Sequence, residues 1–307
     1  MKPINESAAF RIFTSPNCNR RDFIVDALER RGIKAVVMPI DGKEHIYVVF
    51  PQEKYNPLFG IKTVIAHYDR FTGSPGANDN SSSVFSLMDF AERLMDFRGQ
   101  HNIRMIFTDG EELTDSSDGV SSQGAFALAS LFRRLGITDE AYVFDCMGRG
   151  TVPVMGNATI PQCAPAVLRR RFTELNERAA AMLKAAAGGK FLRLPVGYSD
   201  NAGFLAAGIP AVAITMLPDT EAETYITNLM KNPALQTFVT NKTVAAGTTK
   251  EVLSALLPKT WQLFHTTGDD AASLTPESFS VTAAILDKLA RIRTPADRER
   301  RSAEKGV

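Results

Sequence analysis

The chain has 307 residues, and its 35 lysine and arginine side chains against 34 aspartates and glutamates give a formal net charge of +1. This balance excludes the basic field of a nucleic-acid-binding protein and the acidic excess of a solvating tail. The longest apolar runs, such as residues 209–216, are far shorter than the roughly 20 residues that cross a bilayer, so no membrane partner is expected.

The start of the chain lacks the basic and apolar regions of a signal peptide. The three cysteines, Cys18, Cys146 and Cys163, form no CxxC pair and are expected to be reduced thiols. These features predict a cytoplasmic protein, and a homo-oligomer is compatible with them.

Short apolar runs alternate with segments of helical periodicity, which is typical of an α/β fold. The first third of the chain predicts a helix at 19–31, a hairpin of strands at 34–40 and 45–50 around Asp41-Gly42, a buried strand at 63–69 and a helix at 81–97. Serines at the start of the last helix are predicted to cap it.

The rest of the chain predicts strands at 103–108, 141–145, 152–155, 191–194 and 211–216, with helices at 124–135, 165–187 and 201–207. A C-terminal helix is expected after Thr275 as its cap, with Pro276 in its first turn. Together these elements predict a single domain over residues 1–307, with a mixed, mostly parallel sheet and helices on both faces. Residues 218–259 are predicted to be an insertion of mixed helical character, and the tail from residue 294 is charged.

The most informative feature is the pair Glu111 and Glu112, which follows the apolar run that begins at Ile103. Consecutive side chains of an extended backbone point to opposite sides, so one carboxylate could bind a cation while its neighbour transfers a proton. On its own, such a pair is more often a solvated acidic turn.

Other metal-binding side chains follow neighbouring apolar runs or lie in loops. They are His67, Asp69, Asp79, Asp145 and His265. Because ligands bind at the carboxyl ends of strands in open α/β sheets, these groups are expected to converge. Bound cations would relieve the repulsion between the carboxylates, and imidazoles among carboxylates suit Zn²⁺ better than Mg²⁺ or Ca²⁺. Each residue also has an ordinary alternative as a core histidine, a turn residue or a helix cap, but these alternatives leave the ordered set unexplained.

Six motifs, taken in order, resemble the metal-binding motifs of the M28 family of di-zinc aminopeptidases. They are Ala66-His-Tyr-Asp69, Pro75-Gly-Ala-Asn-Asp-Asn80, Phe107-Thr-Asp-Gly-Glu-Glu112, Phe144-Asp145, Tyr198-Ser-Asp-Asn-Ala-Gly-Phe204 with Gly208-Ile-Pro210, and Phe264-His-Thr266. The resemblance covers about residues 63–292 and is looser before residue 60. It implies a three-layer fold of the zinc-exopeptidase (phosphorylase/hydrolase-like) type.

The resemblance also implies a site for two divalent metal ions, with zinc the expected metal. His67 and Asp145 would bind one ion, and Glu112 and His265 the other. Asp79 would bridge the two. The implied activity is the removal of N-terminal residues from peptides through a water shared by the two ions, and the implied partner is a peptide or aminoacyl substrate.

Five further residues receive roles outside the metal ligands. Glu111 would be the general base, and Asp69 would orient the ring of the first histidine ligand. The family usually has histidine where Asn201 stands, so Asp200 and Asn201 are weaker candidates for substrate binding. Arg70 could pair with a substrate carboxylate, although a structural ion pair is the stronger expectation.

Three alternatives remain open. Glutaminyl cyclases share this fold and much of the pattern but use one zinc and lack the first histidine ligand, so the presence of His67 favours hydrolysis. A serine hydrolase would use Ser199, Asp219 and His265, but it leaves the glutamate pair without a role. A degenerate member acting as a binding domain would have lost ligands, and here all are retained. The segment 218–259 is interpreted equally well as a lid over the pocket or as a peripheral packing or oligomer-contact element.

Overall fold

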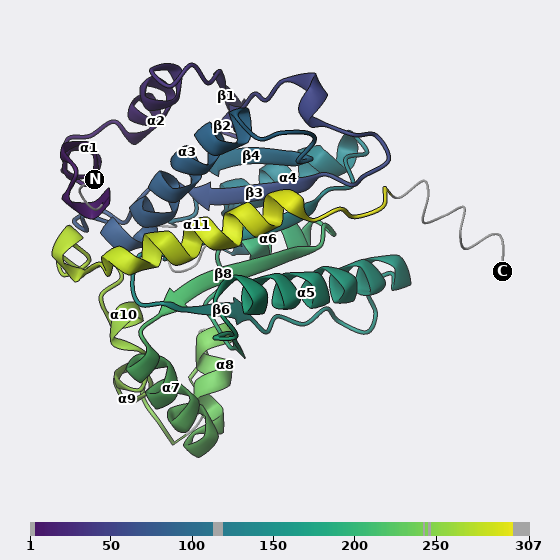
Figure 1. Cartoon of the computed structure of the whole chain (residues 1–307). Helices are drawn as coiled ribbons and strands as arrows, with labels where there is room; N and C mark the ends of the chain where they lie inside the picture. Colours follow the sequence, from purple (N-terminus) through teal and green to yellow (C-terminus); the bar gives the residue numbers. More distant parts are fainter. Residues whose placement is uncertain (1–3, 113–118, 242, 245–246, 297–307) are drawn as a thin grey trace.

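The computed structural model describes residues 4–112, 119–241, 243–244 and 247–296. Its strands form one sheet in the order β1-β2-β4-β3-β5-β8-β6-β7 (Figure 1). Their bounds are β1 Ala35–Ile40, β2 Lys43–Val48, β3 Lys62–His67, β4 Ile103–Thr108, β5 Glu140–Phe144, β6 Val152–Gly156, β7 Leu192–Leu194 and β8 Ala211–Leu217. The pairs β3/β4, β3/β5, β5/β8 and β6/β7 are parallel, whereas β1/β2, β2/β4 and β6/β8 are antiparallel. The sheet is therefore mixed and mostly parallel, as predicted.

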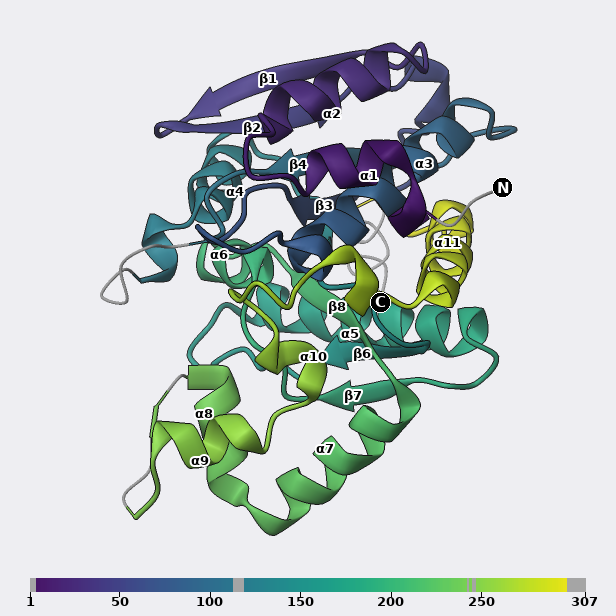
Figure 2. The ribbon, with the colours of Figure 1, turned by 90° about the vertical axis from the view of Figure 1, so that its left-hand side faces the viewer.

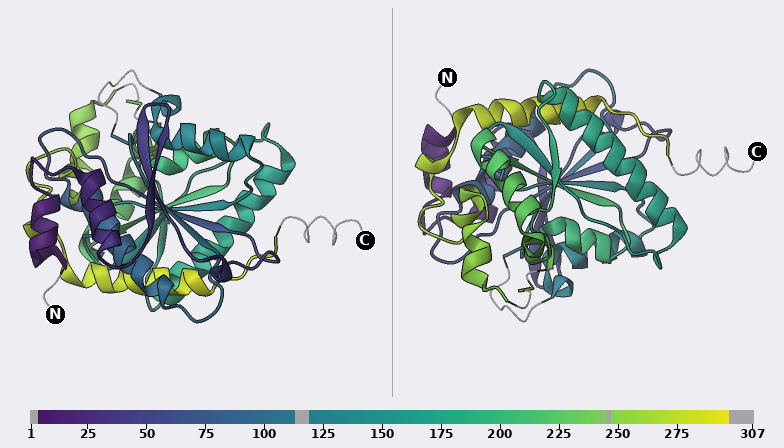
Figure 3. Two further views of the ribbon diagram at one scale, coloured as in Figure 1. Left: turned by 90° about the horizontal axis from the view of Figure 1, so that it is seen from above. Right: turned by 90° about the horizontal axis from the view of Figure 1, so that it is seen from below.

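Helices cover both faces of this twisted sheet, whose strands fan out when they are seen from above or below (Figure 3). Helices α3, α5 and α11 lie on one face, with α1 and α2 beside α3, and helices α4 and α6 lie on the other (Figure 1). Their bounds are α1 Ala8–Phe13, α2 Arg20–Glu29, α3 Ser82–Met95, α4 Gly124–Arg134, α5 Ala166–Ala186, α6 Asp200–Ala206 and α11 Pro276–Arg291. None of the helices in the described chain is long and apolar enough to cross a bilayer.

Two apolar layers separate the sheet from its helices, and the central strands contribute to both. Val64 of β3 packs in the layer under α3 and α11, whereas its neighbour Ile65 packs with Leu128 and Phe132 of α4 on the opposite face. Successive side chains of a strand alternate between faces, so a strand covered on both sides must be apolar throughout. This explains the continuous apolar runs from which the central strands were predicted.

The hydroxyl groups at two helix starts act differently from the prediction. Ser81 and Ser82 precede or begin α3, but their hydroxyls donate to the carbonyls of Gly76 and Asn78 instead of accepting from the helix amides. The predicted capping by serine is therefore wrong, because the buried loop before α3 has carbonyls that need donors. Thr275 does occupy the cap position of α11, but its hydroxyl accepts from the amide of Gly150 at 2.9 Å.

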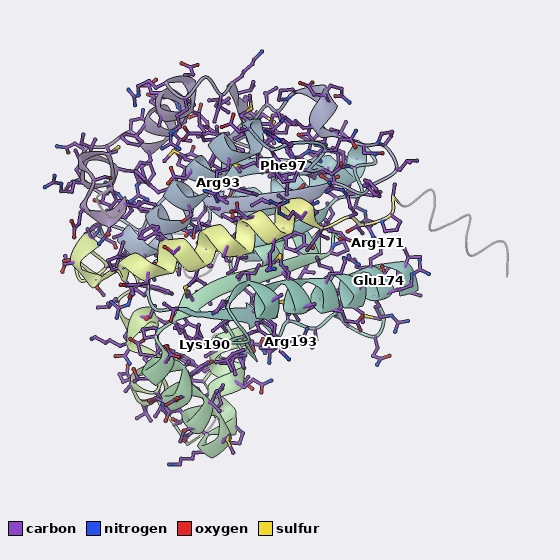
Figure 4. All side chains as sticks on the ribbon, in the orientation of Figure 1. Arg93, Phe97, Arg171, Glu174, Lys190 and Arg193 are labelled. Carbon is purple, nitrogen blue, oxygen red and sulfur yellow. The ribbon has the colours of Figure 1, made fainter. Side chains whose placement is uncertain are left out.

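Residues 218–259 fold as α7 Asp219–Lys231, α8 Pro233–Asn241 and α9 Lys250–Ala255 and end at the first residue of α10 Lys259–Gln262. They lie at the β7 end of the sheet, opposite the β1/β2 hairpin (Figure 2), around a small apolar cluster that includes Tyr225 and Leu235. Lys190, labelled in Figure 4, pairs with Asp219 at 2.7 Å. Residues 242 and 245–246 of this segment, and 297–307 of the predicted tail, lie outside the described residues. The chain passes from α10 directly into the loop that carries His265.

Candidate functional site

The candidate residues lie at the carboxyl edge of the three central strands. β3 lies between β4 and β5 and runs parallel to both, so all three strands end at the same edge. His67 is the last residue of β3, and Asp145 directly follows β5. The neighbouring strands therefore bring together side chains that are far apart in the sequence.

A first group of metal-binding atoms comes from His67, Asp79 and Asp145. Nε2 of His67 lies 3.2 Å from Oδ1 of Asp79 and 3.5 Å from Oδ1 of Asp145. The three ligand atoms all lie within 4.8 Å of one another, and the histidine ring is fully buried. One nitrogen and two oxygens thus converge on a single point.

A second group comes from Asp79, Glu112 and His265. Nε2 of His265 lies 2.9 Å from Oε2 of Glu112 and 3.7 Å from Oδ2 of Asp79. The half-exposed histidine ring stacks on Phe71, with ring centroids 4.5 Å apart. Asp79 belongs to both groups and directs Oδ1 toward one and Oδ2 toward the other.

The electrostatics of both groups favour a bound cation. Burial by itself would lower the pKa of His67, but the carboxylates of Asp145, Asp69 and Asp79 hold it well above its usual value. Burial and the charge of Asp79 raise the pKa of Glu112 to about 7. Neighbouring carboxylates contribute to both shifts, and the excess of negative charge that they create is one that a proton or a metal ion can offset.

The residues present also fit zinc by their donor chemistry. Among the described residues, neither ring nitrogen of His67 has a hydrogen-bond partner of good geometry, and neither does Oε1 of Glu112. Buried polar atoms are rarely left unpaired, and coordination to a metal would satisfy the histidine Nε2 and the glutamate oxygen. Histidine nitrogens with carboxylate oxygens form a usual donor set for zinc.

Asp69 lies behind the first group and joins two loops. Its Oδ1 is 3.4 Å from Nδ1 of His67, and its Oδ2 accepts from the backbone amide of Glu112 at 2.9 Å. The carboxylate therefore faces the ring nitrogen that points away from the ligand group. This is the position from which the predicted orienting role would be exerted.

Glu111 has different partners from Glu112. Its Oε1 accepts from Nε2 of Gln123 at 3.3 Å, and it belongs to neither ligand group. Burial, and to a lesser extent the charges of Asp145 and Glu112, raise the pKa of Glu111 well above its usual value. A carboxyl group with a raised pKa is suited to exchange protons near neutral pH.

The separation of these two glutamates arises in a loop and not in a strand. β4 ends at Thr108, and Gly110 has a φ of 77°, a left-handed conformation that glycine adopts readily. Both glutamates follow this turn and lie in the loop, not in β4. Their carboxylates have different partners, Gln123 for Glu111 and His265 for Glu112.

The asparagines on either side of Asp79 bind the loop that follows β5. Oδ1 of Asn78 accepts from the amide of Gly148 at 2.7 Å. Nδ2 of Asn80 donates to the carbonyl of Phe144 at 3.0 Å, and its Oδ1 accepts from the amide of Cys146 at 3.1 Å. These contacts are not predicted from the sequence, where the only signal is an acid between two asparagines.

Asp269 binds the loop of Asp79 from the other side, and the sequence analysis does not predict this contact. Its carboxylate accepts from the backbone amides of Asn78 at 2.8 Å and Asp79 at 3.1 Å, and its carbonyl accepts from the amide of Ala77. The side chain is completely buried. Its only sequence signal was its place four residues after His265.

Asp200 and Asn201, the weaker substrate candidates, are buried at the start of α6. Asp200 accepts from the hydroxyl of Thr108, and burial raises its pKa to about 7. Oδ1 of Asn201 accepts from the amide of Ser199 at 3.0 Å. Both side chains therefore bind neighbouring protein groups, and their contact with substrate stays a prediction.

Arg70 binds backbone carbonyls and not the carboxylate expected of an ion pair. Its guanidinium donates to the carbonyls of Thr14, Ser15 and Pro16 at 2.7–3.0 Å, so its described partners are neutral. Within the described residues the ion-pair prediction is wrong, because the C-terminal end of α1 and the residues after it offer three carbonyls to the guanidinium. A role for Arg70 in substrate binding stays a prediction.

The serine-hydrolase alternative requires different contacts. Asp219 pairs with Lys190 at 2.7 Å, and His265 pairs with Glu112 at 2.9 Å. Ser199 is buried. The acid and the histidine of that triad thus bind other groups.

Comparisons with known proteins identify solved structures of the same fold and a sequence family. Solved structures that share the fold include the LapA aminopeptidase of Legionella pneumophila, with a TM-score of 0.59 and 14% identity over 92% of this chain and 69% of that chain. A Zn-dependent exopeptidase from Parabacteroides distasonis has a TM-score of 0.59 and 14% identity over 93% and 97%. A glutaminyl cyclase of Porphyromonas gingivalis has a TM-score of 0.59 and 17% identity over 92% and 95%. These identities show a common fold alone, and a comparison with curated proteins finds no significant match.

The sequence description of Peptidase family M28 matches residues 52–290. This segment covers more than half of the chain and contains both ligand groups as well as Glu111. The chain belongs to Peptidase family M28.

Proposed function

We propose that the protein is a two-metal aminopeptidase, with zinc as the expected metal, that hydrolyses N-terminal residues from peptides. The observation that carries this proposal is the position of Asp79, which directs one carboxylate oxygen toward each of two ligand groups. Two ions a few ångströms apart can share a carboxylate that offers one oxygen to each, so this arrangement supports two ions over one. Membership of the peptidase family supports the reaction class.

Each side chain of the site has a separate role in the proposed hydrolysis. Bound zinc would supply a Lewis acid for the scissile carbonyl and would lower the pKa of a nearby water. Glu111 takes the proton of the attacking water and gives it to the leaving amine, which its raised pKa and its freedom from the ligand groups support. Asp69 fixes the ring of His67 through Nδ1.

The two adjacent glutamates allow a matched test. Glu111→Gln should keep the metal content of wild type and lower kcat by about 10²–10⁴-fold, the usual contribution of a general base. Glu112→Gln should lower the metal content instead. Metal analysis and hydrolysis of a panel of aminoacyl-coumarin substrates, with and without a chelator, measure both effects. Full activity of the Glu111→Gln variant would refute the mechanism.

The number of ions can be tested at the first ligand group. His67→Ala removes the only nitrogen donor of that group and should reduce the bound metal from two ions toward one. Metal analysis of the purified variant after equilibration with zinc measures the ratio. Retention of both ions would show that His67 is not a ligand.

A glutaminyl-cyclase-like reaction is the second candidate, because structures of glutaminyl cyclases share the fold. The histidine of the first ligand group favours hydrolysis. Mass spectrometry of a peptide with N-terminal glutamine separates the two: a cyclase releases ammonia and leaves the peptide otherwise intact, whereas an aminopeptidase releases the free amino acid. A protein that binds no metal and converts no substrate would be a binding domain, the third candidate.

A further inference from the structure

The first residue of α2 places a buried guanidinium behind the metal-ligand loops. Arg20 is 6% exposed. Its Nη1 donates to the carbonyls of Tyr68 at 3.0 Å and Asp69 at 3.2 Å. Its Nη2 donates to the carbonyl of Pro75 at 2.8 Å and to the hydroxyl of Ser81 at 3.0 Å. One side chain thus binds both ends of the single connection between β3 and α3: the residues directly after His67 and the residues on either side of Asp79.

The charge of Arg20 has no direct counter-ion, since it makes no ion pair within the described chain. Burial and, to a lesser extent, the nearby charge of Arg70 lower its pKa to about 10, while the carboxylates of Asp69 and Asp79 oppose this shift. The group therefore stays cationic at neutral pH. Its planar fork reaches acceptors at both ends of the β3–α3 connection at once, which the compact ammonium of lysine cannot do.

A second arginine, Arg70, reaches from the connection after β3 to the N-terminal segment. Arg70 follows Asp69 directly and donates to the carbonyls of Thr14, Ser15 and Pro16, between α1 and α2. Thr14 is the C-terminal cap of α1, where a cation is favourable for the helix dipole. The N-terminal segment and the site loops therefore each bind the backbone of the other through an arginine.

Aromatic packing holds the same segment on α3. Phe10 and Phe13 of α1 lie edge-to-face on Phe85 of α3, with centroids 5.0 and 5.4 Å apart. The guanidinium of Arg20 lies 4.6 Å from the ring centroid of Phe13. The segment thus packs as an integral layer next to the helix that follows Asp79, although it precedes residue 52, where the family match begins.

We propose that Arg20 is a positioning residue of the metal centre, which holds the start of the β3–α3 connection, next to His67, and its end, next to Asp79, in a fixed relation from the N-terminal segment. The inference rests on the metal centre of the proposed function but not on its substrate. Without the guanidinium, the two ends of this connection lose their common hydrogen-bond donor. Asp79 then remains a ligand but loses its fixed spacing from His67.

The test compares Arg20→Met and Arg20→Lys with Arg21→Met, which alters the next residue of the same helix. Arg21 is more exposed and pairs with Asp22 and Glu44. Zinc dissociation constants of the metal-free proteins, from competition with a chromophoric chelator, should rise by about 10–100-fold in Arg20→Met, the usual effect of a lost outer contact. Arg20→Lys should show a smaller rise, and Arg21→Met should stay within about twofold of wild type.

The absorption spectrum of the cobalt-substituted protein gives a second readout. A residue that only stabilises the fold would leave this spectrum unchanged in the folded protein, whereas loss of a positioning residue should alter it. Wild-type zinc affinity and spectrum in folded Arg20→Met would overturn the proposal. If that variant does not fold, wild-type zinc affinity in Arg20→Lys has the same consequence.

The two proposals can fail separately. An inactive wild type whose zinc affinity depends on Arg20 would refute the aminopeptidase and keep the positioning role. An active enzyme whose zinc affinity does not change when Arg20 is replaced would keep the aminopeptidase and refute the positioning role. A wild type that binds no zinc would overturn both.

Discussion

Replacing Asp269 by alanine tests how the bridging residue is held. The side chain is completely buried and accepts from two backbone amides, those of Asn78 at 2.8 Å and Asp79 at 3.1 Å. Each buried donor left without a partner costs about 1–3 kcal/mol, so the two together cost about 2–6 kcal/mol. Burial raises the pKa of Asp269 to about 6, so its charge is itself unfavourable and its removal offsets part of that cost. We therefore expect the free energy of unfolding to fall by about 2–4 kcal/mol.

The neighbouring aspartate provides the control. Asp270 is exposed and accepts from the amides of Ala272 and Ser273 in a short 3₁₀-helix, so Asp270→Ala should cost about 1 kcal/mol or less. Urea unfolding of the two metal-free variants measures the difference, and zinc affinity should fall only in Asp269→Ala. If Asp269→Ala is no more destabilising than Asp270→Ala, the reasoning about the two amides is wrong.

Three further predictions concern backbone strain, pH and metal binding. A Cβ at Gly76 would lie 2.6 Å from the carbonyl oxygen of Asp79, whereas a Cβ at Gly73 meets nothing within 4 Å. Both glycines have positive φ, so the backbone strain of an alanine is common to both positions. In thermal unfolding, Gly76→Ala should therefore lower the free energy of unfolding by at least about 1 kcal/mol more than Gly73→Ala. Burial, with nearby lysines, lowers the pKa of His101 to about 3, so the unfolded state binds the proton more tightly and stability is lost as the pH falls below 6.5. In urea titrations, His101→Asn should reduce the dependence of the free energy of unfolding on pH by up to about 1.4 kcal/mol per pH unit. An unchanged pH dependence would contradict the assignment. Zinc at 100 times its dissociation constant should stabilise the metal-free protein by about 2.7 kcal/mol if one site binds only the folded state, and calorimetry that shows no rise in Tm would exclude a preformed site.

Most elements of the fold could be predicted from the sequence because their signals are local. The hairpin at β1/β2 follows from its Asp-Gly turn, and the central strands follow from continuous apolar runs that are buried on both faces. The short helix α1 was not predicted, since six residues carry too little periodicity. Residue preference predicts the serines before α3 as helix caps, but in the structure their hydroxyls donate to buried carbonyls of the preceding loop.

For the site, the donor types and their order along the chain can be predicted from the sequence, because the residues that follow apolar strands lie at one edge of a parallel sheet. Which oxygen of Asp79 faces which group, and the position of Glu111 apart from both groups, depend on how the chain packs. The tertiary structure also supplied the supports, such as Asp269, which bonds to Asp79 across 190 residues of sequence. A hydrogen bond between such distant segments depends on how the whole chain packs and leaves no periodic or local signal in the sequence.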